Sequence, residues 1–292
     1  MTALFPGFSA RKVRTRGTTI NLKAGGSGEP VLLLHGYPQT HAMWHKVAPE
    51  LARDYTVVCP DLRGYGDSSK PKGLPDHSNY SKRVMALDML EVMQALGHER
   101  FHVVGHDRGA RVGHRLARDH GRHVASLTVL DISPTLKMYQ GTNLQFAKAY
   151  YHWFFLIQEA PLPELMLQGR APFYILKRLG RGKSGLKHFS KEAMAEYVRA
   201  FRDPRTIHAT CEDYRASATI DLMHDQKDKS KLKLPVLALW GKHGVIEALF
   251  DCLADWREVA AEVRGRALPC GHFIAEEKPK ELLAELRRFL KT

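Results

Sequence analysis

Four short apolar runs in the first half of the chain constrain its fold more than any other feature. They read VLLLHG (31–36), YTVVCPD (55–61), FHVVGHD (101–107) and VASLTVLDI (124–132). Each is apolar at successive positions, which is typical of strands that are buried on both faces. Segments with helical periodicity separate them, and the first strand pattern of all, TTINLKAG, begins at residue 18. Strands that alternate with helices predict an α/β fold with a doubly wound, mostly parallel sheet.

The alternation of strands and helices stops in the middle of the chain. Residues 134–231 show helical periodicity and many aromatic side chains, and no strand pattern interrupts them. Strand patterns return at PVLALWG (235–241) and EVRGRALP (262–269). We therefore expect a core domain formed by residues 1–133 and 232–292, with residues 134–231 inserted as a helical cap domain. Helices inserted at the carboxyl edge of such a sheet would cover a pocket there.

The composition excludes several classes of protein. No apolar run approaches the roughly 20 residues that a transmembrane helix needs, so we expect no membrane association. The four cysteines are scattered without a C-x-x-C pair, and the sixteen histidines show no metal-ligand spacing. This pattern favours a cytoplasmic protein with reduced thiols and without a metal site.

The net charge of +13 raises the question of nucleic-acid binding. The Lys and Arg residues are spread over the whole chain. The densest stretch, KRLGRGKSGLK (177–187), lacks the interleaved aromatic residues of a single-strand binding surface. We therefore expect no specific nucleic-acid partner, because a diffuse positive field of this kind attracts small anions instead.

The segment VVGHDRGAR (103–111) carries the chemistry that the sequence predicts. It combines a strand, a Gly-x-Asp-x-Gly turn and a helix, which is the arrangement of a nucleophile elbow with Asp107 where a serine usually stands. A simple helix-capping role is the alternative for this residue. A serine that attacked saturated carbon would form an ether, whereas a carboxylate forms an ester that histidine-activated water can hydrolyse. Asp107 therefore indicates substitution at sp³ carbon, with a halide or an epoxide oxygen as the leaving group.

Other positions complete the expected catalytic apparatus. His272, in the loop after the last strand, is expected to act as the base. Asp131, at the carboxyl end of the strand after the nucleophile's helix, is expected to orient His272. The other location for this residue, after PVLALWG, offers only Glu247. The backbone N–H groups of Tyr37 and Arg108 are expected to form an oxyanion hole.

The motifs HGYPQT, DLRGYGDS and GHDRGAR, with the late GHF, resemble the α/β-hydrolase superfamily along essentially the whole chain. The aspartate narrows the resemblance to the branch of haloalkane dehalogenases and epoxide hydrolases. The Asp-Arg-x-x-Arg step and the His-Trp pair look like the fluoroacetate (haloacetate) dehalogenases. This resemblance implies a homodimer, and it implies that His152, Trp153 and Tyr214 hold the leaving halide.

Arg108 and Arg111 are three positions apart at a helix start, so both can lean toward one pocket. Two forked guanidiniums suit a small carboxylate held by bidentate bonds. Haloalkane dehalogenases generally have a Trp directly after the nucleophile, and this chain has Arg108 there. The departure indicates an anionic substrate, with the halide held elsewhere. Replacing Arg108 by Leu is then expected to abolish turnover of carboxylate substrates while leaving the fold intact.

The leading hypothesis is a hydrolytic dehalogenase that converts haloacetate and water into glycolate and halide through an aspartyl ester, with no cofactor. The alternative is an epoxide hydrolase with the same three catalytic residues. That enzyme would need phenolic donors, such as Tyr214 with Tyr150 or Tyr151. A third hypothesis is a binding protein without activity, but such proteins often lack a catalytic residue and all three are present here.

Overall fold

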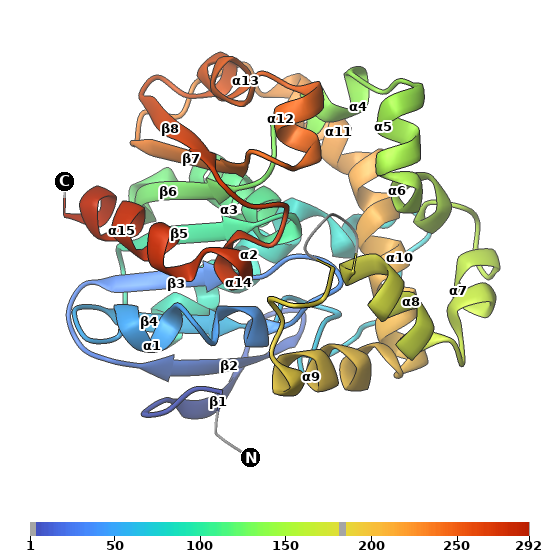
Figure 1. Cartoon of the computed structure of the whole chain (residues 1–292), viewed down its shortest axis with the longest axis horizontal. Coiled ribbons are helices and arrows are strands. Elements are labelled where there is room, and N and C mark those ends of the chain that lie inside the picture. The colour runs from blue at the N-terminus through green and yellow to red at the C-terminus, as the bar shows by residue number, and fades with distance from the viewer. Residues whose placement is uncertain (1–3, 181–184, 292) are drawn as a thin grey trace.

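Eight strands form one sheet at the centre of the molecule, in the order β1-β2-β4-β3-β5-β6-β7-β8 (Figure 1). The computed structural model describes residues 4–180 and 185–291, so residues 181–184 of the basic stretch 177–187 lie outside the described residues. The strands are β1 (Ser9–Arg14), β2 (Thr19–Gly25), β3 (Pro30–Leu34), β4 (Thr56–Pro60), β5 (Phe101–His106), β6 (Val124–Leu130), β7 (Val236–Gly241) and β8 (Val263–Leu268).

The larger part of the sheet is parallel, as the sequence predicts. Strands β3 to β8 pair in parallel, whereas β1 and β2 run antiparallel to their neighbours. The apolar runs are buried on both faces, and Leu32, Leu33 and Leu34 of β3 have no exposed surface. Each fully buried side chain of this size stabilises the fold by about 1.5–3 kcal/mol. Burial of the parallel strands therefore accounts for the core.

The sequence pattern does not predict the edge strand β1. Its residues, SARKVR, include one half-buried apolar side chain, Val13, and the others are exposed. The segment is a strand because it pairs with β2, from Ser9 opposite Ala24 to Arg14 opposite Thr19. A strand of this kind is stabilised by pairing with its neighbour, so the order of apolar and polar residues in its own sequence does not predict it.

Helices cover both faces of the sheet, with α1, α14 and α15 in front of it and α2 and α3 behind it in Figure 1. They are α1 (Ala48–Leu51), α2 (Lys82–Ala95), α3 (Arg108–Asp119), α12 (Val245–Leu249), α13 (Cys252–Val259), α14 (Ile274–Glu277) and α15 (Pro279–Leu290), with short 3₁₀ turns at His41–Trp44, Ser78–Tyr80 and Gly121–His123. In the described part of the chain, no helix combines the length and the apolarity that crossing a bilayer requires.

Between β6 and β7 the described residues form helices and no strand. These helices are α4 (Thr135–Gln140), α5 (Leu144–Ala149), α6 (Tyr151–Leu156), α7 (Leu162–Leu167), α8 (Ala171–Leu179), α9 (Lys191–Phe201), α10 (Pro204–Ala218) and α11 (Ile220–Lys227). Figure 1 shows them on the right of the view, beyond the ends of the central strands. The long helix α10 packs against α6, α7, α9 and α11 and so joins the group. The α/β fold with an inserted helical cap is confirmed.

The winding of the sheet reverses at β3, because β4 lies on one side of it and β5 on the other. In open parallel sheets, ligands bind outside the carboxyl ends of the strands at such a point. The loops after β3, β5, β6 and β8 carry Tyr37, Asp107, Asp131 and His272, respectively. The topology therefore places all four candidate residues at one edge of the sheet, beneath the cap helices.

Candidate active site

Asp107 lies at the sharp turn between β5 and α3. Its φ of +48° is in the left-handed region, which a non-glycine residue adopts only under strain. Glycines on both sides allow the close approach of strand and helix. A Cβ on Gly105 would lie 2.5 Å from the Cα of Ala110, and one on Gly109 would lie 2.4 Å from the carbonyl oxygen of His35. This turn directs the carboxylate away from the strand, as in a nucleophile elbow.

One oxygen of the Asp107 carboxylate is held by the backbone. The Tyr37 N–H donates to Oδ1 at 3.0 Å, and the Arg108 N–H follows in the first turn of α3, where amides have no acceptor within the helix. Burial alone would raise the pKa of Asp107, but the interactions with His272, His106 and the two arginines outweigh it and lower the pKa to about 2. Asp107 is therefore an ionised carboxylate with one oxygen fixed and the other left to react.

The structure brings His272 and Asp131 together. Nδ1 of His272 lies 2.5 Å from Oδ2 of Asp131, and Oδ1 accepts the Gly241 N–H at 2.8 Å. A histidine whose Nδ1–H is donated to a carboxylate presents Nε2 as a base. Glu247, the other candidate for this role, accepts a hydrogen bond from Trp240 instead. The geometry thus favours Asp131 as the partner of His272.

Arg108 is fully buried, and the cap already engages most of its guanidinium. Nε and Nη2 donate to the two carboxylate oxygens of Asp213 at 2.9 and 2.7 Å, and Nη2 also donates to the Ser217 hydroxyl at 2.6 Å. Nη1 has no partner among the described residues. Arg108 can therefore offer a substrate one NH₂ group and not the free fork that the sequence predicts.

A buried cluster of charges holds Asp213 in turn. Lys82, at the start of α2, pairs with Asp213 and lies 3.4 Å from Asp221. Tyr65 donates its hydroxyl to Asp213 at 2.6 Å. Arg108 and Lys82 face the two carboxylates of Asp213 and Asp221, so the cluster is neutral as a whole. The charge of Arg108 is thus compensated within the protein.

Arg111 is buried as well but lacks this compensation. Nη1 donates to the Thr135 hydroxyl at 2.9 Å, and Nη2 reaches the sulfur of Met138, a weak acceptor, at 3.1 Å. Nε has no partner among the described residues, none of which forms an ion pair with Arg111. Burial lowers the pKa of Arg111, and Asp107 opposes that shift. Asp107 is near enough to act on Arg111 but forms no ion pair with it. A buried guanidinium without a directly paired carboxylate is costly, so a bound anion would stabilise it.

The three halide candidates of the cap lie against these arginines. The Tyr214 ring centroid is 4.1 Å from Cζ of Arg108, and the Trp153 ring is 4.9 Å from Cζ of Arg111. His152 meets Tyr214 edge-on, with 5.7 Å between the ring centroids. The Trp153 Nε1–H and the Tyr214 hydroxyl are buried and have no partner among the described residues. Buried donors left unpaired cost about 1–3 kcal/mol each, which an acceptor such as a halide would offset.

Two residues of this site carry no signal in the sequence. Arg178, from α8, is buried, donates to Nε2 of His152 at 2.7 Å, and lines a cavity of about 170 Å³ together with Tyr150 and His272. Asp213 is the ion-pair partner of Arg108. Each has another charged residue directly or nearly adjacent in its helix, such as Lys177 beside Arg178 and Glu212 beside Asp213, so only the packing of cap on core distinguishes it. Among the described residues, no group of three or more His, Cys, Asp or Glu side chains could hold a metal ion.

Comparisons with known proteins identify the family of this chain. A family model described as the α/β hydrolase fold matches residues 29–279. A curated fluoroacetate dehalogenase from Burkholderia sp. is 48% identical over 98% of this chain and 95% of its own length. The chain therefore belongs to the α/β-hydrolase family and, within it, to the fluoroacetate (haloacetate) dehalogenase family. The resemblance read from the motifs is confirmed.

Two further similarities extend over nearly the whole chain. A soluble epoxide hydrolase from Corynebacterium sp. (strain C12) is 35% identical over 94% of both chains. The crystal structure of a putative α/β hydrolase from Nostoc sp. PCC 7120 superposes with a TM-score of 0.96 and 56% sequence identity, covering 97% of this chain and 98% of that one. The epoxide hydrolase is the more distant of the two curated relatives, so it supports the alternative activity less strongly.

Proposed function

We propose that this chain is a hydrolytic dehalogenase of small 2-haloacids such as fluoroacetate, which it converts with water into glycolate and halide. The observation that carries the proposal is the combination of Asp107, an ionised carboxylate at an elbow, with Arg111, a buried guanidinium that has no ion-pair partner among the described residues. The first suits attack on sp³ carbon, and the second suits a carboxylate. Similarity to the fluoroacetate dehalogenase supports the same substrate class.

In the first step, Oδ2 of Asp107 attacks the α-carbon of the haloacetate. Arg111 and Nη1 of Arg108 hold the substrate carboxylate. The halide leaves with the bonding electron pair, and Trp153 and Tyr214 donate to it together with His152. Burial raises the pKa of Tyr214 well above its ordinary value, so its hydroxyl remains a donor. Donors that meet charge only as the bond breaks favour the transition state over the ground state, which accelerates the reaction.

In the second step, water hydrolyses the ester. Nε2 of His272 takes a proton from the water, whose oxygen attacks the ester carbonyl carbon of Asp107. Negative charge develops on Oδ1, the atom that the Tyr37 N–H already binds, so this donor needs no rearrangement. Asp131 stabilises the imidazolium. His272 returns its proton to the departing oxygen, which leaves as the hydroxyl group of glycolate. The carboxyl group of Asp107 loses the second proton of the water to solvent and is again a carboxylate.

Halide release tests the proposal directly. The protein is incubated with fluoroacetate, chloroacetate and bromoacetate while a halide electrode records the product, and styrene oxide turnover is assayed in parallel. We expect a catalytic efficiency for at least one haloacetate well above that for the epoxide. Diol formation without halide release would favour the epoxide hydrolase, although one of the phenols considered for it, Tyr151, is 44% exposed.

Replacing Arg111 by Leu is expected to lower kcat/KM for haloacetates roughly ten- to hundredfold, because a hydrogen bond to a charged group contributes about 1.5–3 kcal/mol. The loss should appear mainly in KM, since the interaction with the carboxylate exists before and during the attack. Arg53→Leu, at a side chain 69% exposed, is the matched control and should leave both constants unchanged. An unchanged KM in the Arg111 variant would contradict the assignment.

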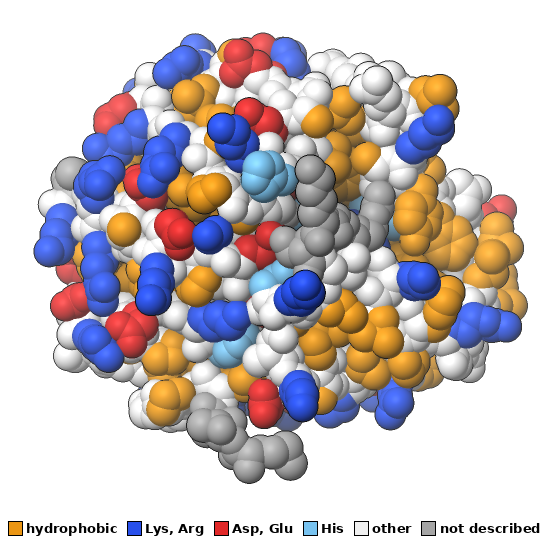
Figure 2. Space-filling model, viewed as in Figure 1, with side chains coloured by type: hydrophobic (Ala, Val, Ile, Leu, Met, Phe, Trp, Pro, Cys, Tyr) orange, Lys and Arg blue, Asp and Glu red, His pale blue; other side chains and the backbone are white. Residues whose placement is uncertain are grey.

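We also propose that two copies of the chain associate through the cap. Large apolar side chains are exposed on its helices, among them Leu144, Leu165 and Phe173, which are 70%, 61% and 65% exposed. Figure 2 shows hydrophobic side chains gathered on the right of the view, where the cap lies. Exposed apolar patches mark interaction sites more often than isolated apolar residues do. Light scattering should give the mass of a dimer for the native chain and of a monomer for Leu165→Glu with Phe173→Glu, and a native monomer would contradict the proposal.

We propose further that the enzyme consists of a core domain and a cap domain and that it is located in the cytoplasm. Residues 1–133 and 232–292 form the catalytic core domain, and residues 134–231 form the cap domain that supplies the halide donors. This division is supported by the helices that occupy the described residues between β6 and β7. The four cysteines are free and buried, which fits the reducing cytoplasm.

A further inference from the structure

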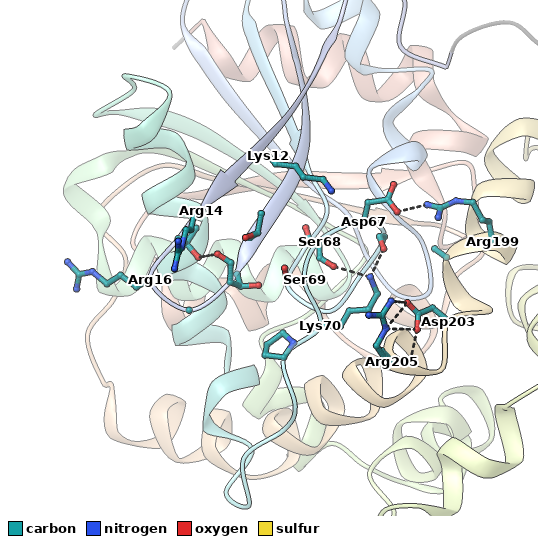
Figure 3. A pocket seen from close by; sticks show the side chains of 17 residues that line it. Lys12, Arg14, Arg16, Asp67, Ser68, Ser69, Lys70, Arg199, Asp203 and Arg205 are labelled. Carbon is teal, nitrogen blue, oxygen red and sulfur yellow. Dashed lines mark hydrogen bonds and ion pairs between the residues drawn. The ribbon is translucent and has the colours of Figure 1, made fainter.

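A larger cavity, of about 970 Å³, lies at the edge of the sheet apart from the candidate active site (Figure 3). It is lined by Lys12 and residues 14–19, at the end of β1 and in the turn into β2, by residues 66–71 of the loop after β4, and by residues of the cap between 199 and 205. None of these belongs to the catalytic apparatus or to the halide site. The proposed dehalogenase reaction therefore does not account for this cavity.

Positive charge dominates the lining of this cavity. The only carboxylates among the described lining residues are Asp67 and Asp203, and both are already occupied. Asp67 pairs with Arg199 at 3.0 Å, and Asp203 pairs with Arg205 at 2.8 Å. The cations that line the cavity are Lys12, Arg14, Arg16, Lys70, Arg199 and Arg205. They exceed the carboxylates of the lining by four. Two of them also have acidic partners outside the lining, since Arg16 pairs with Glu91 and Arg199 pairs with Glu196. In Figure 3, Lys12 and Arg14 lie on the core, whereas Arg199 and Arg205 lie on the cap.

Lys12 and Arg14 are the cations without compensation. They alternate with Val13, which packs against the core, so both side chains lie on the same face of β1. Neither forms a hydrogen bond or an ion pair through its side chain with a described residue. Their partners on β2, Thr19 and Asn21, are uncharged. Two neighbouring positive charges thus face the cavity, and no acidic side chain in the described part of the chain pairs with either of them.

Hydrogen-bond donors accompany these charges. The ammonium of Lys70 donates to the carbonyl oxygens of Gly66 and Ser68 at 2.7 and 2.9 Å, which leaves one of its three N–H groups. The Thr18 hydroxyl is buried and has no partner among the described residues. Ser69 adds a further hydroxyl to the lining. The arrangement offers cations and neutral donors, which is the chemistry that recognises phosphoryl oxygens.

Charged side chains on an edge strand also prevent it from pairing with other molecules. That role accounts for Lys12 and Arg14 alone, but not for the remaining N–H group of Lys70 or for the buried Thr18 hydroxyl, which line the same cavity. The described lining contains no aromatic side chain, so nothing would stack on a nucleobase. We propose that this cavity is a binding site for a small, non-aromatic anion that carries two or more phosphoryl groups.

Isothermal titration of the full chain with tripolyphosphate at physiological salt tests the proposal. We expect saturable binding of one anion, and on the order of tenfold or greater loss of affinity when Lys12→Gln and Arg14→Gln are combined, since each removes a charge-assisted contact. Lys233→Gln with Arg257→Gln, two exposed cations outside the cavity, removes the same charge and should leave the affinity unchanged. Haloacetate turnover should be equal in all three proteins.

Several outcomes would overturn the proposal. Equal loss of affinity in the two double variants would show general attraction to a basic protein. Competition by glycolate would show that tripolyphosphate occupies the active site. Citrate that binds as tightly as tripolyphosphate would remove the preference for phosphoryl groups. Because the readout is binding, failure here leaves the proposed dehalogenase activity untouched, and failure of that activity leaves this site untouched.

Discussion

Replacing Asp107 by Asn is expected to lower the rate of halide release from haloacetates by about ten-thousandfold or more. The amide has nearly the shape of the carboxylate, but it is neutral and a poor nucleophile, so the ester intermediate does not form. Its oxygen can still accept the Tyr37 N–H that now binds Oδ1, and the elbow keeps its geometry. The measurement is the initial rate of halide release, with the thermal unfolding temperature as the check on the fold.

Substrate binding separates a chemical effect of this substitution from a structural one. Arg111 remains in the Asp107 variant and loses its carboxylate neighbour, so calorimetry should find fluoroacetate bound at least as tightly as by the native chain. Substantial halide release by the variant would show that another group attacks the carbon.

Because the pKa of Asp107 is lowered to about 2, the carboxylate of the native chain stays ionised throughout mildly acidic solution. A fall in activity between neutral pH and pH of about 5 must therefore come from another group.

Replacing His272 by Gln is expected to stop the reaction after one turnover. Asp107 can still expel halide, but no base activates water against the ester, so the steady-state rate should fall by about a hundred- to ten-thousandfold. A rapid-quench experiment should show a burst of halide equal to the enzyme concentration. Mass spectrometry should then find one carboxymethyl group on the tryptic peptide that contains Asp107.

The His272 prediction has a matched control. His98→Gln alters a histidine in the loop between α2 and β5, at the end of β5 opposite to Asp107. This variant should show the same burst and the same steady-state rate as the native chain. Steady multiple turnover by the His272 variant would assign the base to another residue. A slow rate without a burst would instead mean that His272 contributes to the first step.

The structure changes the effect expected from replacing Arg108 by Leu. From the sequence, Arg108→Leu should abolish carboxylate turnover and leave the fold intact. In the structure, the same substitution would leave Asp213 buried with one cation fewer, and breaking a buried ion pair in this way costs about 3–5 kcal/mol. Loss of activity in that variant would therefore mix a substrate effect with a folding effect. Arg111, which forms no ion pair with a described residue, gives the cleaner test.

The positions of Asp107 and Asp131 could be predicted because each follows a strand whose apolar run is plain in the sequence. His272 follows a weaker pattern, EVRGRALP, and its place after the last strand is what the sequence showed. Parallel strands end at one edge, so residues just after them meet there whatever the details of packing. The glycines beside Asp107 added the turn geometry, since no larger side chain fits the close approach to Ala110 and His35. Local patterns and topology together were sufficient for this part of the site.

The charge environment of the arginines, the contact of Arg178 with His152 and the strand β1 could not be predicted. Arg108 and Asp213 are 105 positions apart, and their contact depends on how α10 of the cap docks on α3 of the core. Periodicity records which face of an element is buried, but not which charged side chain meets which across an interface. The sequence by itself therefore determines the fold and the positions of the residues that we propose as the nucleophile and its base. The docking of cap on core determines which guanidinium remains uncompensated for a substrate, because ion pairing depends on distances of a few ångströms between segments far apart in the chain.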